Sequence, residues 1–293
     1  MRLAAIDIGT NACRLLISEV ITHEKEEPRF NKLNLVRVPL RLGFDVFETG
    51  EISKPKKGMI LQTMKAYAHL MNAYRVDRHI AVATSAMRDA KNRNEVVRKI
   101  FLETGINIQI ISGDFEASLI YESHIAEHLN SNNNYLYIDV GGGSTEITFF
   151  SNNKLVYKRS FNIGTIRILK NMVKDSDWDL MKEEIRENIK GIKNTTAIGT
   201  GGNINKVFSL SKKKDGKSLD INLLKDYYKE FSACSLQERI RNYNLREDRA
   251  DVIVPALLIY MQVMKWANIE EILVPKIGLA DGLIQHLYAQ FSA

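Results

Sequence analysis

Two runs of the chain place an aspartate just before a glycine turn, and each turn separates two apolar, strand-like segments. The first run is Ile6-Asp7-Ile8-Gly9-Thr10 and the second is Ile138-Asp139-Val140-Gly141-Gly142. Glycines let backbone N–H groups approach an oxyanion that a Cβ would block. An aspartate cannot bind an anion directly, but it can bind a cation that bridges to phosphate oxygens. Structural hairpins use the same residue types, but two such turns at equivalent places in two halves favour phosphate binding.

These turns supply the first candidate site residues. Asp7 and Asp139 are the candidate metal ligands. The candidate phosphate-binding residues of the two turns are Gly9, Thr10, Asn11, Gly141, Gly142, Gly143 and Ser144.

A third glycine-rich turn is Gly199-Thr200-Gly201-Gly202-Asn203. If a helix opens at Asn203, the free N–H groups at its N-terminus create a further anion site. The turn is not a dinucleotide fingerprint, because Ile204 replaces the third glycine. The chain also lacks the sequence of a nucleotide P-loop. The candidate phosphate-binding residues here are Thr200, Gly201 and Gly202.

Two glutamates near these turns could act on water. Glu116 opens an expected helix, and Glu146 follows Ser144 on an expected strand. Hydrolysis of a phosphoanhydride needs a base that orients or deprotonates water, together with cations that neutralise the developing charge. Glu116 and Glu146 are therefore the candidate catalytic residues, and Glu146 is also a candidate metal ligand. Taken singly, Glu116 also fits a residue that complements the helix dipole, and Glu146 fits a solvent-facing strand position.

Two arginines follow short polar turns. Arg14 comes after Thr10 and Asn11, and Arg88 comes after Thr84-Ser85. A guanidinium at such a place can hold phosphate oxygens through two parallel hydrogen bonds. A surface ion pair is an equally good interpretation of each arginine.

A local excess of lysines follows the third glycine turn. Runs of like charge are usually solvated surface, which favours a simple exposed loop, but the same lysines could receive a polyanion. The lysines are Lys206, Lys212, Lys213, Lys214 and Lys217, and they surround a single acidic residue, Asp215.

The segment His124-Ile125-Ala126-Glu127-His128 matches the inverted zinc-protease pattern His-x-x-Glu-His. Two histidines one helical turn apart could bind zinc, and Glu127 could activate water. No clear third ligand accompanies them, so an exposed helical face is the favoured interpretation.

The elements that must position these residues repeat in two halves. Apolar runs predict strands over 3–7, 14–20, 35–40, 79–84 and 106–111 in the first half, and over 135–139, 145–150, 155–161, 196–198 and 271–275 in the second. Helical periodicity predicts helices after Ser53, through 96–101, over about 114–129 and 180–192, after Ser235, through 253–264 and from about Asp281. We therefore expect an α/β chain of two similarly built lobes.

The composition of the chain narrows the class of protein to which it can belong. The chain has 293 residues, a net charge of +6, 45% hydrophobic residues and 26% charged residues, which is typical of folded globular chains and argues against disorder. The longest mostly apolar stretch, Val252 to Met264, contains a proline and a glutamine and is short for a bilayer span. Cys13 and Cys234 are too few for a disulfide framework. We expect a reduced, cytoplasmic protein without a membrane partner.

Six segments in order resemble the exopolyphosphatase and guanosine pentaphosphate phosphatase family, within the actin-like, sugar-kinase-like superfamily. They span nearly the whole chain, and the specificity lies in their order rather than in any one of them. The segments run over 5–14, 84–90 (Thr-Ser-Ala-Met-Arg-Asp-Ala), 111–117 (Ile-Ser-Gly-Asp-Phe-Glu-Ala), 138–146, 199–202 and 279–282 (Leu-Ala-Asp-Gly).

The resemblance implies two ribonuclease-H-like lobes flanking a phosphate-binding cleft, one over 1–118 completed by 278–293 and one over 119–277. It implies that Glu116 positions or activates the attacking water and that Asp139 and Glu146 belong to a Mg²⁺ site. It also implies that Arg14 and Arg88 face the phosphate chain. Thr10 and Ala12 stand where many relatives carry serine, and Gln285-His286 departs from the usual ending.

The expected activity is Mg²⁺-dependent release of terminal orthophosphate from inorganic polyphosphate. The alternative is hydrolysis of guanosine pentaphosphate to guanosine tetraphosphate, and further alternatives are a small-molecule kinase of the superfamily or a non-catalytic alarmone sensor. The expected partner is polyphosphate or guanosine penta- or tetraphosphate, with no nucleic acid. The chain resembles a short form without the C-terminal helical domains of longer members, so it is expected to be a monomer or a homodimer.

Overall fold

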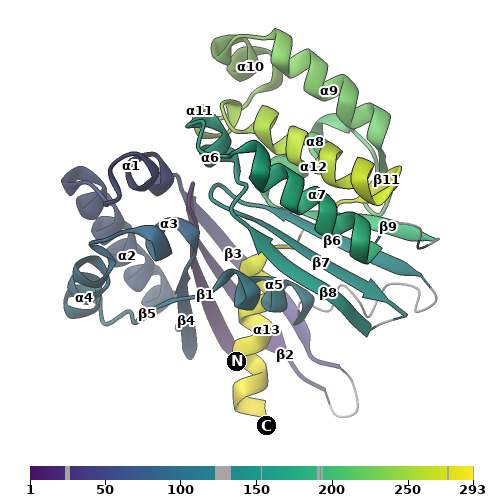
Figure 1. Cartoon of the computed structure of the whole chain (residues 1–293). Coiled ribbons are helices and arrows are strands. Elements are labelled where there is room, and N and C mark those ends of the chain that lie inside the picture. The colour runs from purple at the N-terminus through teal and green to yellow at the C-terminus, as the bar shows by residue number, and fades with distance from the viewer. Residues whose placement is uncertain are drawn as a thin grey trace. The chain divides into compact units, whose positions relative to one another are not determined.

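The computed structural model describes residues 1–23, 27–122, 133–152, 154–189, 192, 194–275 and 277–292. The chain forms two compact units, and each contains one β-sheet (Figure 1). Unit 1 comprises Met1–Ser123 and Gly278–Ala293, and unit 2 comprises His124–Ile277. The histidine pattern at 124–128 lies outside the described residues.

The sheet of unit 1 has five strands in the order β3-β2-β1-β4-β5. The first three strands are antiparallel, whereas β1, β4 and β5 are parallel, because helices connect the later strands. The strands are β1 (Arg2–Ile8), β2 (Cys13–Ile21), β3 (Arg29–Val38), β4 (Arg78–Ala83) and β5 (Ile108–Ile110). The helices are α1 (Leu42–Thr49), α2 (Lys54–Ala73), α3 (Ser85–Asp89), α4 (Arg93–Thr104), α5 (Gly113–Glu122) and α13 (Leu279–Ser292).

Helices α5 and α13 pack together on one face of this sheet. Leu3 and Ala5 of β1 form a buried cluster with Leu119 of α5 and Leu283 of α13. Side chains alternate between the two faces of a strand. Asp7 therefore projects from the same face as Leu3 and Ala5, which is the face that α5 and α13 cover.

The closest approach between α5 and α13 occurs at Gly282. A Cβ built on Gly282 would overlap the carbonyl oxygen of Leu119 and would lie 2.7 Å from its carbonyl carbon. Backbone atoms cannot move aside as a flexible side chain can, so this crossing requires glycine. The conformation of the chain around Glu116 thus depends on a residue near the other end of the sequence.

Unit 2 repeats the same sheet plan with six strands in the order β10-β11-β9-β6-β7-β8. An antiparallel β6-β7-β8 set pairs through β6 with the parallel strand β9. The strands are β6 (Asn134–Val140), β7 (Thr145–Ser151), β8 (Lys154–Phe161), β9 (Thr195–Thr200), β10 (Leu219–Asp220) and β11 (Glu271–Leu273). The helices are α6 (Thr165–Leu169), α7 (Asp175–Ile189), α8 (Gly202–Ser211), α9 (Ile221–Ala233), α10 (Leu236–Tyr243), α11 (Glu247–Ala250) and α12 (Ile253–Ala267).

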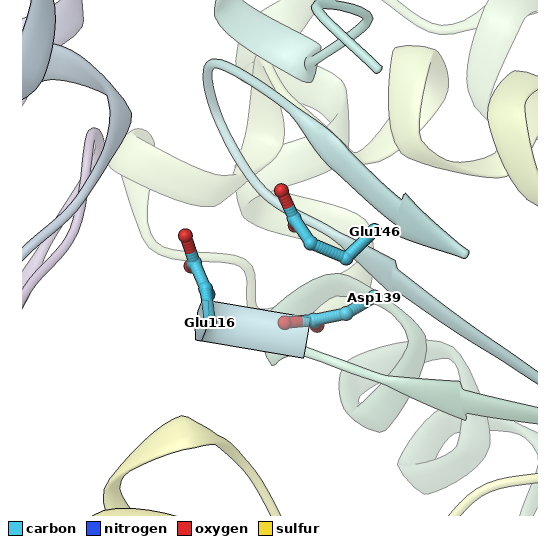
Figure 2. Close-up of side chains that lie close together, drawn as sticks. All are labelled: Glu116, Asp139 and Glu146. Carbon is cyan, nitrogen blue, oxygen red and sulfur yellow. The ribbon is translucent and has the colours of Figure 1, made fainter. Parts of the chain in front are cut away.

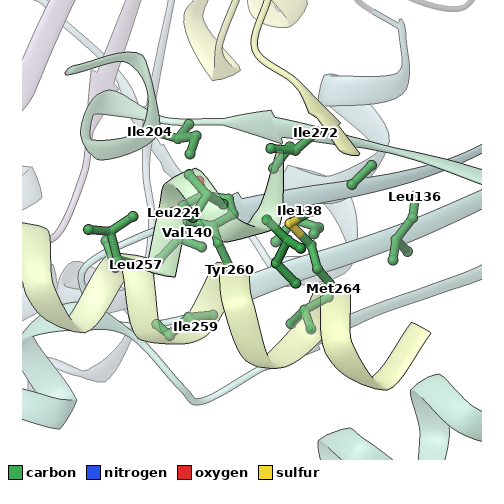
Figure 3. Close-up of a cluster of buried hydrophobic side chains, with 14 of the residues drawn as sticks. Leu136, Ile138, Val140, Ile204, Leu224, Leu257, Ile259, Tyr260, Met264 and Ile272 are labelled. Atoms are coloured by element: carbon green, nitrogen blue, oxygen red, sulfur yellow. The ribbon is translucent and has the colours of Figure 1, made fainter. Parts of the chain in front are cut away.

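The core of unit 2 forms between α12 and one face of the sheet. Leu136, Ile138 and Val140 of β6 lie in one buried cluster with Tyr260 and Met264 (Figure 3). Alternation along β6 then directs Asp139 to the opposite face. The apolar residues of β6 thus fix the direction of its single carboxylate.

Among the described residues, one stretch is long and apolar enough to cross a membrane by length and composition. It is Glu247–Ala267, with a mean hydropathy of 1.3 and with 67% of its window buried inside the protein. A buried core helix passes the same test, and α12 is such a helix, with ten buried residues.

Most expected elements are present with shifted ends. The helix expected after Ser235 is α10, and it begins with a capping box formed by Ser235 and Glu238. The expected helix over 114–129 corresponds to α5, whose described part ends at Glu122. Helix α1 was not expected, because its eight residues lie between a strand pattern and the strong helix signal after Ser53.

Replacing Gly282 by alanine should lower the free energy of unfolding of unit 1 by about 1–3 kcal/mol, the usual range for overpacking. The cause is the forced separation of α13 from the carbonyl of Leu119. Chemical denaturation monitored by circular dichroism measures this change.

The matched control is Gly58→Ala on α2, where a new Cβ meets no atom within 4 Å. Because alanine favours helices over glycine, this variant should be more stable than the wild type by up to about 1 kcal/mol. Equal stability of the Gly282→Ala and wild-type proteins would show that α5 and α13 can separate freely.

Candidate functional site

A line of polar residues crosses four strands of the unit 2 sheet where β6 and β9 end. Asp139 lies directly opposite Glu146 on β7 and opposite Thr200 on β9. Glu146 in turn lies opposite Ser160 on β8. Directly opposed residues point to the same face of a sheet. One face therefore presents two carboxylates flanked by two hydroxyls.

Asp139 and Glu146 place carboxylate oxygens within 4.8 Å of one another. Figure 2 shows the two side chains extending from neighbouring strands in the same direction. Glu146 is only 2% exposed, so the interpretation of this residue as a solvent-facing strand position is wrong. Two ionised carboxylates at this distance repel each other, and a cation between them would relieve that repulsion.

The surroundings of Asp139 fit a hard cation. The ligand atoms are carboxylate oxygens, which Mg²⁺ prefers over nitrogen or sulfur. A Cβ on Gly201 would lie 3.2 Å from Asp139 Oδ1, and Gly201 has a φ of +107°. Glycine therefore serves both the backbone conformation and the space beside this carboxylate.

The turn Gly141 to Ser144 is held by the chain that follows β8. The N–H groups of Thr165 and Ile166 donate to the carbonyls of Gly141 and Gly142 at 3.0 and 2.8 Å. The carbonyl of Gly143 accepts a hydrogen bond from Arg167 Nε at 2.7 Å. All three glycine carbonyls are thus occupied from one side.

The N–H groups of this turn point the other way. Carbonyl and N–H lie on opposite sides of a trans peptide plane. The N–H groups of Gly142, Gly143 and Ser144 therefore face away from the segment that holds the carbonyls. They donate no backbone hydrogen bond in the described part of the chain. Three neighbouring donors of this kind suit a phosphate group.

Gly164 allows this close packing. A Cβ on Gly164 would lie 2.5 Å from the carbonyl oxygen of Gly142. The hydroxyl of Thr145 also donates to the carbonyl of Ile163. Each of these contacts fixes the segment over 160–167 against the turn Gly141 to Ser144.

The third turn ends β9 and begins α8. The helix starts at Gly202, one residue before the expected Asn203. The hydroxyl of Tyr260 donates to the carbonyl of Thr200, and Arg249 Nη1 donates to the carbonyl of Gly202 at 2.6 Å. Burial raises the pKa of Tyr260, and the Asp139 carboxylate adds to that shift. Tyr260 therefore remains a protonated donor at physiological pH.

The buried hydroxyl of Thr200 is the polar group of this line that lacks a hydrogen-bond partner among the described residues. Its side chain is fully buried, and its Oγ1 has no hydrogen-bond partner among the described residues. A buried hydroxyl without a partner is unfavourable. A ligand oxygen or a water molecule at this edge of the sheet would satisfy it.

The turn of unit 1 is built in the same way. The N–H groups of Gly43 and Arg41 donate to the carbonyls of Thr10 and Asn11 at 3.0 and 2.8 Å. Thr10 Oγ1 accepts a hydrogen bond from the N–H of Ala86 at 3.2 Å. The hydroxyl at position 10 is thus used inside the protein.

Asp7 and Arg14 form an ion pair. Arg14 Nη1 lies 2.7 Å from Asp7 Oδ2, and the Asp7 side chain is 3% exposed. Burial raises the pKa of Asp7, and the charge of Arg14 opposes that shift. Because Arg14 already supplies a positive charge, Asp7 needs no metal ion to be stable here. Metal binding by Asp7 and phosphate binding by Arg14 remain predictions.

Glu116 and Arg88 belong to unit 1. Glu116 lies in the first turn of α5, is 8% exposed and is drawn in Figure 2. Arg88 Nη1 donates to the carbonyl of Ile111 at 2.8 Å, just before α5 begins. Arg88 therefore helps to fix the entry to the helix that carries Glu116. Its binding to phosphate remains a prediction.

Four residues that contact the site were not expected from the sequence. Ser160 and Arg167 act through Glu146 and Gly143, and Tyr260 and Arg249 act through the backbone of Thr200 and Gly202. None belongs to a recognisable local motif. Only the strand register reveals Ser160, and only the backbone contacts reveal the other three.

Comparisons with known proteins match these features to one family. A family model described as the Ppx/GppA phosphatase family matches residues 20–291. A bifunctional 3-dehydroquinate synthase/phosphatase of Fusobacterium nucleatum is 31% identical, over 92% of this chain and 44% of that protein. Exopolyphosphatase 1 of Mycobacterium tuberculosis is 24% identical, over 97% of this chain and 87% of that protein. The chain thus spans less than half of the first relative and most of the second.

Solved structures share the fold. A crystal structure of an exopolyphosphatase from Cytophaga hutchinsonii superposes with a TM-score of 0.83 at 24% identity, covering 100% of this chain and 98% of that one. The Aquifex aeolicus Ppx/GppA family member gives a TM-score of 0.80 at 24% identity, covering 100% and 99%. The predicted α/β fold of two actin-like lobes is confirmed. The chain belongs to the Ppx/GppA phosphatase family.

Proposed function

We propose that this chain is a Mg²⁺-dependent hydrolase that releases terminal orthophosphate from inorganic polyphosphate. The observation that carries the proposal is the pair of neighbouring carboxylates, Asp139 and Glu146, whose oxygens lie within 4.8 Å of one another beside the turn whose N–H groups face away from the segment that holds its carbonyls. Membership in a phosphatase family and relatives named exopolyphosphatase support hydrolysis of phosphoanhydride bonds.

Asp139 and Glu146 would hold the divalent cation. When bound, the cation neutralises the negative charge that phosphate oxygens carry and accumulate during phosphoryl transfer. Ser160 and Thr200 flank the two carboxylates in the same line. Neither hydroxyl adds a charge that would compete with the cation.

The two glycine turns of unit 2 would hold the end of the phosphate chain. The N–H groups of Gly142, Gly143 and Ser144 donate to oxygens of the terminal phosphate. Gly201 and Gly202, at the N-terminus of α8, receive the next phosphate, where helix N–H groups favour an anion. The turn of unit 1, with Gly9 and Asn11, and the guanidinium groups of Arg14 and Arg88 receive further phosphate oxygens.

Glu116 acts as the general base. Its carboxylate accepts a proton from water as the water oxygen attacks the terminal phosphorus. The bond between that phosphorus and the bridging oxygen breaks, and the shortened chain leaves with the bridging oxygen. Orthophosphate is released. Fixed donors at the turns stabilise the charge that spreads over the transferred group.

Guanosine pentaphosphate is the second candidate substrate. A protein of Aeromonas salmonicida named guanosine-5'-triphosphate,3'-diphosphate pyrophosphatase is 23% identical, over 97% of this chain and 59% of that protein. Removal of the terminal 5'-phosphate of guanosine pentaphosphate breaks the same type of phosphoanhydride bond, and the same residues of this chain would carry out the reaction. Phosphate release in the absence of an acceptor separates both hydrolases from a kinase, and tight binding without turnover identifies a sensor.

Glu116→Gln should lower the rate of phosphate release from polyphosphate with Mg²⁺ by about 10²-fold or more, because glutamine cannot accept the proton. Release of orthophosphate, measured side by side with polyphosphate and guanosine pentaphosphate, tests this expectation and ranks the two substrates.

The matched control is Asp114→Asn, which removes another carboxylate from the first turn of α5 at an exposed position. It should retain wild-type activity. Equal rates for the Glu116→Gln and wild-type proteins would exclude Glu116 as the base. No release from either substrate by the wild type would exclude the hydrolase.

The lysine-rich loop offers a feature that separates the two substrates. It follows α8, whose ten residues extend about 15 Å from the third turn. Lys213, Lys214 and Lys217 are all exposed. Lys213 donates a hydrogen bond to the carbonyl of Ser218, so we consider Lys214 and Lys217. A long polyphosphate chain can extend beyond the cleavage site to this loop, whereas a nucleotide ends within a few phosphates.

The double variant Lys214→Gln/Lys217→Gln should weaken binding of long-chain polyphosphate and leave turnover of guanosine pentaphosphate unchanged. The dependence of the long-chain binding constant on salt should become shallower by roughly one logarithmic unit per lost contact, by analogy with nucleic acids. Lys225→Gln/Lys229→Gln on α9 removes the same charge elsewhere in unit 2 and serves as the control. Equal losses in both double variants would attribute the effect to net charge alone.

A further inference from the structure

Ser160 makes a direct contact with one of the two central carboxylates. Its Oγ donates to Glu146 Oε1 at 2.7 Å. The two residues are directly opposed in the register of β7 and β8, as Glu146 and Asp139 are in β6 and β7. The irregularity in β7 lies between Phe149 and Phe150, so the pairing near Ser160 is regular.

This hydrogen bond matters because Glu146 is buried. Only 2% of the residue is exposed, so bulk water cannot replace a lost donor easily. A hydroxyl that donates to an ionised carboxylate forms a short and strong hydrogen bond. The contact holds one oxygen of Glu146 toward β8 and so limits the rotation of the carboxylate group.

The carboxylate of unit 1 that corresponds to Asp139 offers a contrast in how a carboxylate is held. Asp7 is opposite Arg14, whose guanidinium pairs with it at 2.7 Å. An arginine neutralises the carboxylate that it positions. A serine positions a carboxylate and leaves its full negative charge available to a cation. The choice of donor therefore distinguishes a structural carboxylate from one that can bind metal.

Ser160 is itself well anchored. It begins the segment that reaches Arg167, and the Thr145 hydroxyl fixes this segment at the carbonyl of Ile163. Arg159, its neighbour in β8, pairs with Glu184 of α7. The end of β8 is thus fixed on either side of the hydroxyl.

We propose that Ser160 is a positioning residue that orients Glu146 for the divalent cation. The proposal rests on the proposed function, in which Glu146 is a ligand of that cation. Removal of a hydrogen bond that orients a metal ligand typically lowers metal affinity by about 10–100-fold.

The test is Mn²⁺ binding, measured by the electron paramagnetic resonance signal of the free ion, for the wild type and three variants. Ser160→Ala and Ser160→Val should raise the apparent Kd for Mn²⁺ by about tenfold, whereas Ser160→Thr should keep the wild-type value. Threonine and valine have nearly the same shape, so their difference reports the hydroxyl. If valine prevents folding, the alanine and threonine variants make the same comparison.

Two outcomes would overturn the role of Ser160. One is wild-type Mn²⁺ affinity in the folded Ser160→Ala protein, and the other is an equal loss in the threonine and valine variants. Glu146→Gln in the same titration separates failure of the Ser160 proposal from failure of the proposed metal site. Loss of affinity in Glu146→Gln but not in Ser160→Ala rejects Ser160 alone, whereas wild-type affinity in Glu146→Gln rejects the metal site as well.

Discussion

The orientation of three peptide groups governs the rest of the site. The carbonyls of Gly141, Gly142 and Gly143 all accept hydrogen bonds from the chain that follows β8. Because each peptide is planar, the next N–H in each case points to the opposite side. The N–H groups that we propose as an anion site are thereby oriented by two backbone donors and by one charged side chain, that of Arg167. A side chain at Gly164 would break this arrangement, because its Cβ would lie 2.5 Å from the carbonyl oxygen of Gly142.

In both units a later segment of the chain holds the carbonyls of a turn, but the charged residues beside the two turns differ. In unit 1, chain that follows β3 holds the turn at Thr10 and Asn11, as chain after β8 does in unit 2. The strand positions beside the turn then diverge. Asp7 faces Arg14, whereas Asp139 faces Glu146. One sheet thus carries an ion pair and the other carries two neighbouring carboxylates, an arrangement that a bound cation would stabilise. The two units therefore share a backbone plan but carry different charges beside their turns.

The sequence predicts the structural features that depend on neighbouring residues in the chain. Alternation and glycine turns identify β1, β6 and the two Asp-x-Gly turns, and the capping box at Ser235 has its own spacing signal. The burial of Glu146 and the contact from Ser160 depend on which strands pair and in what register, which local patterns do not specify. Arg167 and Tyr260 contact backbone carbonyls, so their partners have no side-chain signature. The roles of Gly164 and Gly282 depend on distances to residues far along the chain.

The contact between Gly282 and Leu119 also constrains the order of events during synthesis. Unit 1 cannot close its α5–α13 face until residue 282 has been translated, after all of unit 2. At ordinary elongation rates, the ribosome needs roughly 10–30 s to pass from residue 119 to residue 282. Unit 2 is synthesised in that interval, while the apolar residues Leu3, Ala5 and Leu119 lack their partner helix. The nascent first unit is therefore the portion that a chaperone would be expected to protect.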